Sequence, residues 1–265
     1  MSDILDIDLY REIIKTDLAA ITSPSQLSPI ETAHAVHKNG IVIFPAVLDM
    51  KTLQSLNVEF DHMLDPQQQK SLGFKIDRAD NLVNMRIIRD KLDSQMYPVT
   101  SGLFSIEWMD EVAACYFGEG GYKLNDEIFV SDISETISVQ TVPPFALHFD
   151  KRQVLKFFVY LTDTDESNGA MRAAPGSHYI NREKRLAAMA SGTINEIPNV
   201  LPEPEVPSIP ITGPAGTLFV FDTDMAHGAS HVSAGKTRRT MRGHTHSLKM
   251  LEAMAEDAAR LQAID

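Results

Sequence analysis

Two histidines and one aspartate have the spacing of a metal site. His148, Phe149 and Asp150 read H-x-D, and His227 follows a strand-like run much later in the chain. Side chains two positions apart on a β-strand project to the same side, so His148 and Asp150 can face one ion while Phe149 faces away. Two imidazoles and one carboxylate leave open coordination positions and suit Fe(II) better than zinc. We therefore predict that His148, Asp150 and His227 bind the metal and form the catalytic centre.

Arg238 follows His227 by eleven positions and could hold a co-substrate. A guanidinium group can grip a carboxylate through two parallel hydrogen bonds. A dicarboxylate that chelates the metal needs such a cation for its distal carboxylate, and 2-oxoglutarate has this chemistry. Arg239 would face the opposite side of a strand, so we assign the role to Arg238. The alternative is that Arg238 and Arg239 form an exposed basic pair with Lys236 and Arg242.

The composition indicates one globular domain over residues 1–265. Hydrophobic residues make up 43% and charged residues 23% of the chain, and no apolar stretch is long enough to cross a membrane. The net charge of −12 opposes nucleic acid and anionic membranes as partners and leaves a small molecule as the expected substrate. Residues 1–8 lack the pattern of a secretory signal, so we expect a cytoplasmic protein. Cys115 is the single cysteine, which excludes an intramolecular disulfide and a cysteine-based zinc site, and we expect it to be buried.

Helices are expected early in the chain and strands later. The motif S-P-I-E at residues 28–31 is a capping pattern and Gly40 a C-terminal stop, which together predict a helix over residues 29–39. Asp49 can cap a second helix, after which apolar residues recur at helical spacing. The expected strands span residues 41–45, 82–88, 127–133, 136–141, 155–162, 217–221 and 240–247.

Three segments flank or interrupt the strand-rich region. Residues 1–40 are expected to form a helical N-terminal extension. Residues 193–216 contain six prolines, which oppose a regular helix or a central strand and predict a lid or loop over the site. Residues 248–265 are expected to form an amphipathic C-terminal helix that either docks on the body or contacts a second copy. The protein would then be a monomer or a homodimer.

Further motifs accompany the candidate ligands. They are H-F-D at 148–150, L-T-D at 161–163, S-N-G-A at 167–170, A-P-G-S-H at 174–178, G-T-L-F-V-F at 216–221, H-G at 227–228 and the arginine at 238. With this set the chain resembles the phytanoyl-CoA dioxygenase-like family of Fe(II)- and 2-oxoglutarate-dependent oxygenases. The likeness covers most of residues 30–247. Its motifs are specific for the superfamily and do not identify the substrate.

The resemblance implies a fold, a ligand set and a reaction. The fold would be α+β and mostly β: a double-stranded β-helix, or cupin-like jelly-roll barrel, with flanking helices. His148, Asp150 and His227 would bind Fe(II), Arg238 would bind 2-oxoglutarate, and O2 would be the oxidant. The enzyme would hydroxylate or otherwise oxidise an unactivated C–H bond of a small molecule in specialised metabolism, with release of succinate and CO2.

The sequence departs from the family pattern beside the expected co-substrate. Phe158 stands where many members have tryptophan, and Ala229 stands where they have serine. We keep Phe158 among the expected co-substrate contacts. Ser230, Thr217 or Gln140 could supply the missing polar contact, although each is also compatible with a structural role.

Two other functions stay open. A cupin-like metal dioxygenase or isomerase would use the same three ligands but would have no need for Arg238. A non-enzymatic sensor with the same fold is the second alternative, and the intact ligand set opposes it. Asp150 argues against a halogenase, because the resemblance implies that halogenating relatives have a small residue at that position.

The remaining histidines and several cations complete the candidates. His178 is expected to stabilise a loop, and His231 is a weaker choice than His227 for the third ligand. His244 and His246 form an H-x-H that could be a competing metal pair. An anionic group of the substrate could be recognised by Arg86, Arg89, Lys123 and Lys156.

Overall fold

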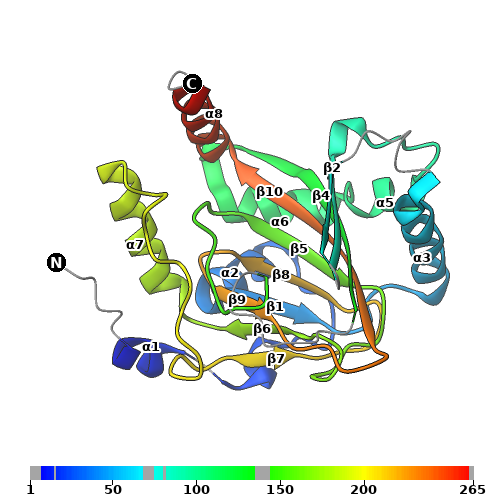
Figure 1. Ribbon diagram of the computed structural model, residues 1–265, viewed down its shortest axis with the longest axis horizontal. Helices are drawn as coiled ribbons and strands as arrows, with labels where there is room; N and C mark the ends of the chain where they lie inside the picture. Colours follow the sequence, from blue (N-terminus) through cyan, green and yellow to red (C-terminus); the bar gives the residue numbers. More distant parts are fainter. Residues whose placement is uncertain (1–6, 15, 68–74, 80–81, 135–143, 263–265) are drawn as a thin grey trace.

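Two antiparallel β-sheets form the body of the protein (Figure 1). The computed structural model describes residues 7–14, 16–67, 75–79, 82–134 and 144–262. Within these residues the larger sheet has the strand order β1-β8-β5-β10-β4-β3-β2 and the smaller one the order β7-β6-β9. The strands are β1 (Ile41–Phe44), β2 (Lys75–Ala79), β3 (Leu82–Ile88), β4 (Tyr122–Ser134), β5 (Leu155–Tyr160), β6 (Met171–Ala174), β7 (Ile209–Ile211), β8 (Leu218–Asp222), β9 (Ala226–Ala229) and β10 (Thr237–Ser247).

Helices cover one face of the larger sheet. Its strands alternate: Phe157 and Val220 point into a core shared with helices, whereas Phe158 and Phe219 point into a core shared with the smaller sheet. This arrangement of two facing sheets with flanking helices is the mostly β jelly roll predicted from the sequence. The helices are α1 (Ile7–Ile13), α2 (Pro29–Asn39), α3 (Met50–Leu64), α5 (Pro98–Leu103), α6 (Glu107–Phe117), α7 (His178–Ser191) and α8 (Leu248–Gln262), with short 3-10 turns η1 (Leu18–Ile21), η2 (Arg89–Lys91) and η3 (Gly118–Gly120).

The predicted helix over residues 29–39 is confirmed, together with its caps. Ser28 and Glu31 form the reciprocal capping box, and Gly40 ends the helix in the left-handed region at φ 83°. A Cβ on Gly40 would lie 2.8 Å from Nδ1 of His178, so this turn requires glycine for space as well as for conformation. The other ring nitrogen of His178 lies 2.9 Å from the carbonyl oxygen of His37. His178 therefore contacts the C-terminal end of α2 from the start of α7, rather than supporting a loop, and it belongs to no three-residue metal cluster in the described chain.

Several sequence expectations differ from the structure. Strand β4 begins at Tyr122 rather than at residue 127, and the strand expected over 136–141 lies outside the described residues. Cys115 is exposed on α6, not buried, because helix α6 turns its buried face, which includes Val112, toward α2 and the sheet. No helix among the described residues is long and apolar enough to span a membrane.

The proline-rich stretch is tied to the body at two places. The backbone of Asn199 and Leu201 forms hydrogen bonds with the segment around Leu147 and Phe149. Farther along, Ile209–Ile211 forms β7, an edge strand, which is the sheet position that tolerates proline. This stretch therefore runs beside the H-x-D segment as a bonded loop.

Two buried aspartates fix the turn between β8 and β9. Asp222 and Asp224 are both fully buried. Arg185 on α7 binds both carboxylate oxygens of Asp224, at 2.6 Å and 2.9 Å. Arg182 contacts both aspartates, and Tyr116 donates to Asp222. The charges of this turn are thus compensated inside the protein.

We expect Arg185→Ala to lower the free energy of unfolding by about 3 to 5 kcal/mol, because Asp224 would lose its two-pronged partner inside the protein. Chemical denaturation measures this change. Lys123→Ala is the control, since Lys123 pairs with Asp90 on the exposed surface and its loss should cost under about 1 kcal/mol. Similar costs for both variants would contradict the assigned role of Arg185.

Candidate metal centre

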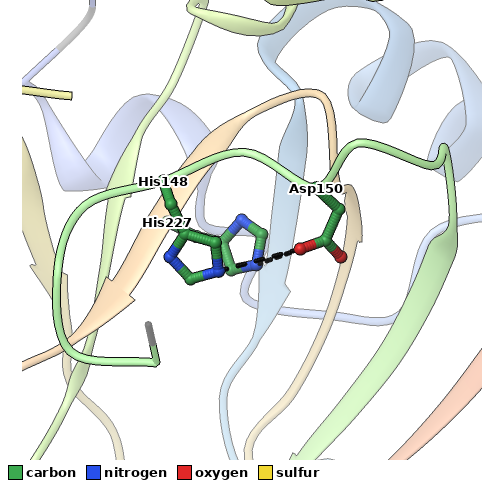
Figure 2. Close-up of side chains that lie close together, drawn as sticks. All are labelled: His148, Asp150 and His227. Carbon is green, nitrogen blue, oxygen red and sulfur yellow. Dashed lines mark ion pairs between the residues drawn. The ribbon is translucent and has the colours of Figure 1, made fainter. Parts of the chain in front are cut away.

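Three side chains converge to form a potential metal site (Figure 2). Nε2 of His148 and Nε2 of His227 lie 3.7 Å and 3.8 Å from Oδ1 of Asp150. One ligand atom from each residue lies within 4.8 Å of the others, and no other group of three or more His, Cys, Asp or Glu residues in the described chain meets this condition. The structure thus brings together the three residues singled out in the sequence.

Individual backbone hydrogen bonds, rather than one regular strand, set the positions of these residues. His148 and His227 exchange two hydrogen bonds, with N···O distances of 2.9 Å and 2.7 Å, so their side chains leave the backbone at the same level. His227 lies in β9, but His148 and Asp150 lie in an irregular segment, and the expectation of a strand there is wrong. The amide of Asp150 instead bonds to the carbonyl oxygen of Thr223 at 3.0 Å. The expected alternation still holds, because Phe149 is fully buried in a different core.

The protonation of the two histidines suits a divalent cation. Nδ1 of His148 lies 2.8 Å from the carbonyl oxygen of Ala146, and Nδ1 of His227 lies 2.9 Å from that of Met225. Each Nδ1 therefore carries the proton and leaves the Nε2 lone pair free to bind an ion. Burial lowers the pKa of His148, and burial and then Lys156 lower the pKa of His227 to about 3. Both rings are neutral at physiological pH, as metal ligation requires.

Lys156 orients the carboxylate of Asp150. Its Nζ lies 2.8 Å from Oδ2, while Oδ1 faces the two histidines. Burial raises the pKa of Asp150, but Lys156, His227 and His148 outweigh this effect and hold it below its ordinary value. The donor set is therefore two neutral imidazoles and one ionised carboxylate, which fits Fe(II).

A cavity of about 310 Å³ opens beside the two histidines and contains Arg238 and Phe158 in its wall. Arg238 is 5% exposed and donates to the carbonyl oxygen of Gly169. Its Nε is buried without a hydrogen-bond partner, and no carboxylate of the described residues pairs with it. Its Cζ lies 6.0 Å from the ring centre of Phe158. This orphaned buried donor matches an incoming carboxylate.

Arg239 points to the other face of the sheet, as strand alternation predicts. It pairs with Asp61 at 2.8 Å and lies over the ring of Phe60. It also approaches Asp132, at 3.6 Å. The two adjacent arginines thus have separate surroundings.

Two of the other proposed co-substrate contacts, Thr217 and Ser230, do not line this cavity in the described chain. Thr217 is buried just before β8, and its hydroxyl donates to the carbonyl oxygen of Pro214 at 2.7 Å. Ser230 lies near Ala170 and does not line the cavity in the described chain. Gln140 lies outside the described residues. Thr217 and Ser230 therefore have surroundings that fit structural roles.

Two residues of β10 that the sequence analysis did not select share the face of Arg238. Thr240 is fully buried and its hydroxyl has no hydrogen-bond partner. Arg242 lines the cavity, and is not part of an exposed basic pair. The sequence could have indicated this placement, because residues two and four positions beyond Arg238 on a strand face the same side as Arg238.

A second cavity, of about 550 Å³, lies on the Asp150 side of the cluster. Its wall has mixed charge: Arg86 pairs with Glu127, and Lys151 donates to Asn195. The two histidines line the first cavity, which we call the inner cavity, and Asp150 lines the second, which we call the outer cavity.

The remaining candidates occupy other sites. Nδ1 of His246 lies 2.7 Å from Oδ1 of Asp126, and the ring centre of His246 lies 6.4 Å from that of His244. These two do not belong to a three-residue metal cluster in the described chain. Arg89 donates to the carbonyl oxygen of Leu124, and His231 is exposed.

Comparison with known proteins agrees with this geometry. Residues 36–240 match the family described as phytanoyl-CoA dioxygenase (PhyH). No curated protein matches the chain. The fold is similar to that of the non-heme alpha ketoglutarate dependent epimerase SnoN from nogalamycin biosynthesis, at 16% identity over 83% of this chain and 82% of that chain, with a TM-score of 0.55.

Two further solved structures share the fold. EctD from S. alaskensis, in its apoform, is 16% identical over 89% of this chain and 84% of that chain, with a TM-score of 0.57. HygX from Streptomyces hygroscopicus, with nickel and 2-oxoglutarate bound, is 15% identical over 82% of this chain and 87% of that chain, with a TM-score of 0.53. At these identities the likeness establishes a common fold.

We expect Gly228→Ala to weaken Fe(II) binding by about 10- to 100-fold. A Cβ on Gly228 would lie 2.8 Å and 2.9 Å from the carbonyl oxygens of Phe145 and Ala146, so the segment leading to His148 must move. Anaerobic titration calorimetry with Fe(II) measures the affinity. Gly120→Ala is the matched control, because nothing lies within 4 Å of a Cβ there. Equal affinities in the two variants would show that His148 does not depend on this close approach.

Proposed function

The chain belongs to the phytanoyl-CoA dioxygenase family of non-haem iron enzymes that use 2-oxoglutarate, and on this premise we propose that it oxidises an unactivated C–H bond of a small molecule. We assign His148, Asp150 and His227 as the iron ligands and Arg238 as the residue that holds the distal carboxylate of 2-oxoglutarate. The observation that carries the proposal is the unpaired Arg238 in the cavity beside the two histidines. Iron bound here would couple the decarboxylation of 2-oxoglutarate, to succinate and CO2, to the activation of O2.

The residues of the chain position and shield the reactants. Arg238 fixes one end of 2-oxoglutarate through the donors of its guanidinium group, of which Nε has no partner in the described residues. Phe158 contributes an apolar part of the cavity wall, with its ring centre 6.0 Å from Cζ of Arg238. Lys156 holds Oδ2 of Asp150 and so leaves Oδ1 for the metal. The buried wall also excludes water from the reacting groups.

We propose that the primary substrate approaches the metal ligands from the outer cavity. The wall of this cavity includes Asp150 and Met254 of α8 but not Arg238, which would hold 2-oxoglutarate in the inner cavity. We propose that the substrate belongs to specialised metabolism, which the origin of SnoN in nogalamycin biosynthesis supports.

Arg238 and Asp150 separate this proposal from its alternatives. A metal dioxygenase or isomerase that does not use 2-oxoglutarate would gain nothing from a buried, unpaired Arg238, which is costly to retain. The carboxylate of Asp150 would bind the metal at the position that a halogenase would need for chloride. Hydroxylation, or a related oxidation such as desaturation or cyclisation, is therefore the favoured outcome.

We expect the anaerobic protein with Fe(II) and 2-oxoglutarate to show a weak visible charge-transfer band, because chelation by the keto acid uses two adjacent open positions. Arg238→Gln should raise the 2-oxoglutarate concentration that half-saturates this band by tens-fold or more, since loss of a buried charge partner costs about 2 to 5 kcal/mol. Arg239→Gln is the matched control and should change it little.

The outcomes of this titration are distinct. A wild-type protein with neither the band nor affinity for 2-oxoglutarate would refute the proposed function. A large defect confined to Arg239→Gln would reverse the assignment of the two arginines. No defect in either variant would favour the metal enzyme that does not use 2-oxoglutarate.

A further inference from the structure

A second arginine in the inner cavity lacks an acidic partner among the described residues. Arg242 donates to Oγ of Ser131 at 2.7 Å and to Oδ1 of Asn84 at 3.1 Å. Both acceptors are neutral, and none of the ion pairs of the described chain includes Arg242. A guanidinium group has five N–H donors, so these two hydrogen bonds leave three for a ligand. Because Arg242 lines the cavity, its charge is available to whatever the cavity binds.

Arg238 and Arg242 lean to opposite sides of β10. Arg238 donates to Gly169, in the loop that follows β5, whereas Arg242 donates to Ser131 of β4 and Asn84 of β3. Strand β10 lies between β5 and β4, so the two guanidinium groups have different hydrogen-bond partners, although Cζ of Arg238 lies 6.0 Å and Cζ of Arg242 5.9 Å from the ring centre of Phe158. Their α-carbons are about 13 Å apart, since a strand rises roughly 3.3 Å per residue. One carboxylate bound to Arg238 would therefore leave Arg242 without a counter-ion.

The charges of the cavity also require a second anion. Its wall in the described chain includes Lys156, Arg238 and Arg242, but no aspartate or glutamate. Asp150 neutralises the charge of Lys156, and the distal carboxylate of 2-oxoglutarate would neutralise that of Arg238. Burial and the nearby Arg238 lower the pKa of Arg242 to about 10, so it stays charged at neutral pH. In a chain with a net charge of −12, this local positive charge selects an anionic ligand.

The surroundings of Arg242 hold it ready for such a ligand. Ser131 donates to Oδ1 of Asn84 at 2.6 Å, which joins the three polar groups in one network. The ring centre of Phe129 lies 4.7 Å from Cζ of Arg242, and that of Phe158 lies 5.9 Å away. Aromatic rings on which a guanidinium stacks leave its edge free for a carboxylate.

We propose that Arg242, supported by Ser131 and Asn84, binds a carboxylate of the primary substrate. The substrate is then an anionic small molecule that approaches from the outer cavity and whose charged group lies in the inner cavity, on the β3 and β4 side, opposite the 2-oxoglutarate held by Arg238. This inference rests on the proposed function for the identity of the second ligand, whereas the anion site itself rests on the geometry of Arg242.

The test uses the protein loaded with Zn(II), which does not turn over, and saturated with 2-oxoglutarate. The probes are small hydroxy-, amino- and aryl-substituted carboxylic acids, each paired with its primary amide, and binding is measured by ligand-observed NMR. We expect acids of this set to bind in preference to their amides. Arg242→Gln should weaken that binding by roughly tenfold or more. Arg242→Lys keeps the charge and should retain part of it, and Arg239→Gln should match the wild type.

A second arm separates the primary substrate from the co-substrate. Titration of the anaerobic Fe(II) protein with 2-oxoglutarate should give affinities for Arg242→Gln and the wild type that agree within about threefold. A loss as large as that of Arg238→Gln would overturn the proposal and assign Arg242 to 2-oxoglutarate. Equal binding of acids and amides by the wild type, or of acids by Arg242→Gln, would also overturn it. Acid binding that depends on Arg242 in a protein without affinity for 2-oxoglutarate would refute the proposed function and leave the anion site intact.

Discussion

The metal site depends on two backbone hydrogen bonds between His148 and His227. They join segments that are far apart in the chain, and they set both imidazoles at one level, facing Asp150. The pairing is possible because Gly228 lets the carbonyl oxygens of Phe145 and Ala146 approach closer than a Cβ would allow. A side chain at this position would press against the backbone that leads to His148. The chemistry of the site thus begins with a steric constraint on the backbone.

The turn between β8 and β9 holds Asp150 in place. Its carbonyl oxygen at Thr223 binds the amide of Asp150, and its buried Asp222 and Asp224 are anchored to α7 by arginines. A buried charge is stable only with such partners, so the turn has little freedom to move. The carboxylate of Asp150 is then oriented by Lys156 from β5. Each ligand is fixed by contacts that lie outside the three-residue cluster, as metal sites generally require.

The candidate site residues could be identified from the sequence more readily than the side chains that contact them. Strand alternation correctly separated Arg238 from Arg239, because it depends only on local geometry. The same rule could have placed Arg242 in the cavity. It could not show that Ser131 and Asn84 lie there, since this depends on the order of strands in the sheet. Lys156 was considered as a substrate contact, but its pairing with Asp150 required the fold.

Some local expectations failed for related reasons. The hydroxyl of Thr217 donates to the carbonyl oxygen of Pro214 in the same turn. The presence of a threonine in the sequence does not reveal that its hydroxyl is already bonded locally. The H-x-D segment is irregular because its partners are single bridges, to Val200 and to His227, rather than a continuous strand.

The most direct test of the assigned metal and co-substrate sites is a crystal structure of the protein grown without O2 in the presence of Fe(II) and 2-oxoglutarate, with anomalous data collected at the iron edge. We expect one iron peak within bonding distance of His148, Asp150 and His227, and the distal carboxylate of 2-oxoglutarate on Arg238. Iron at His244 and His246, or 2-oxoglutarate bound away from Arg238, would contradict the account.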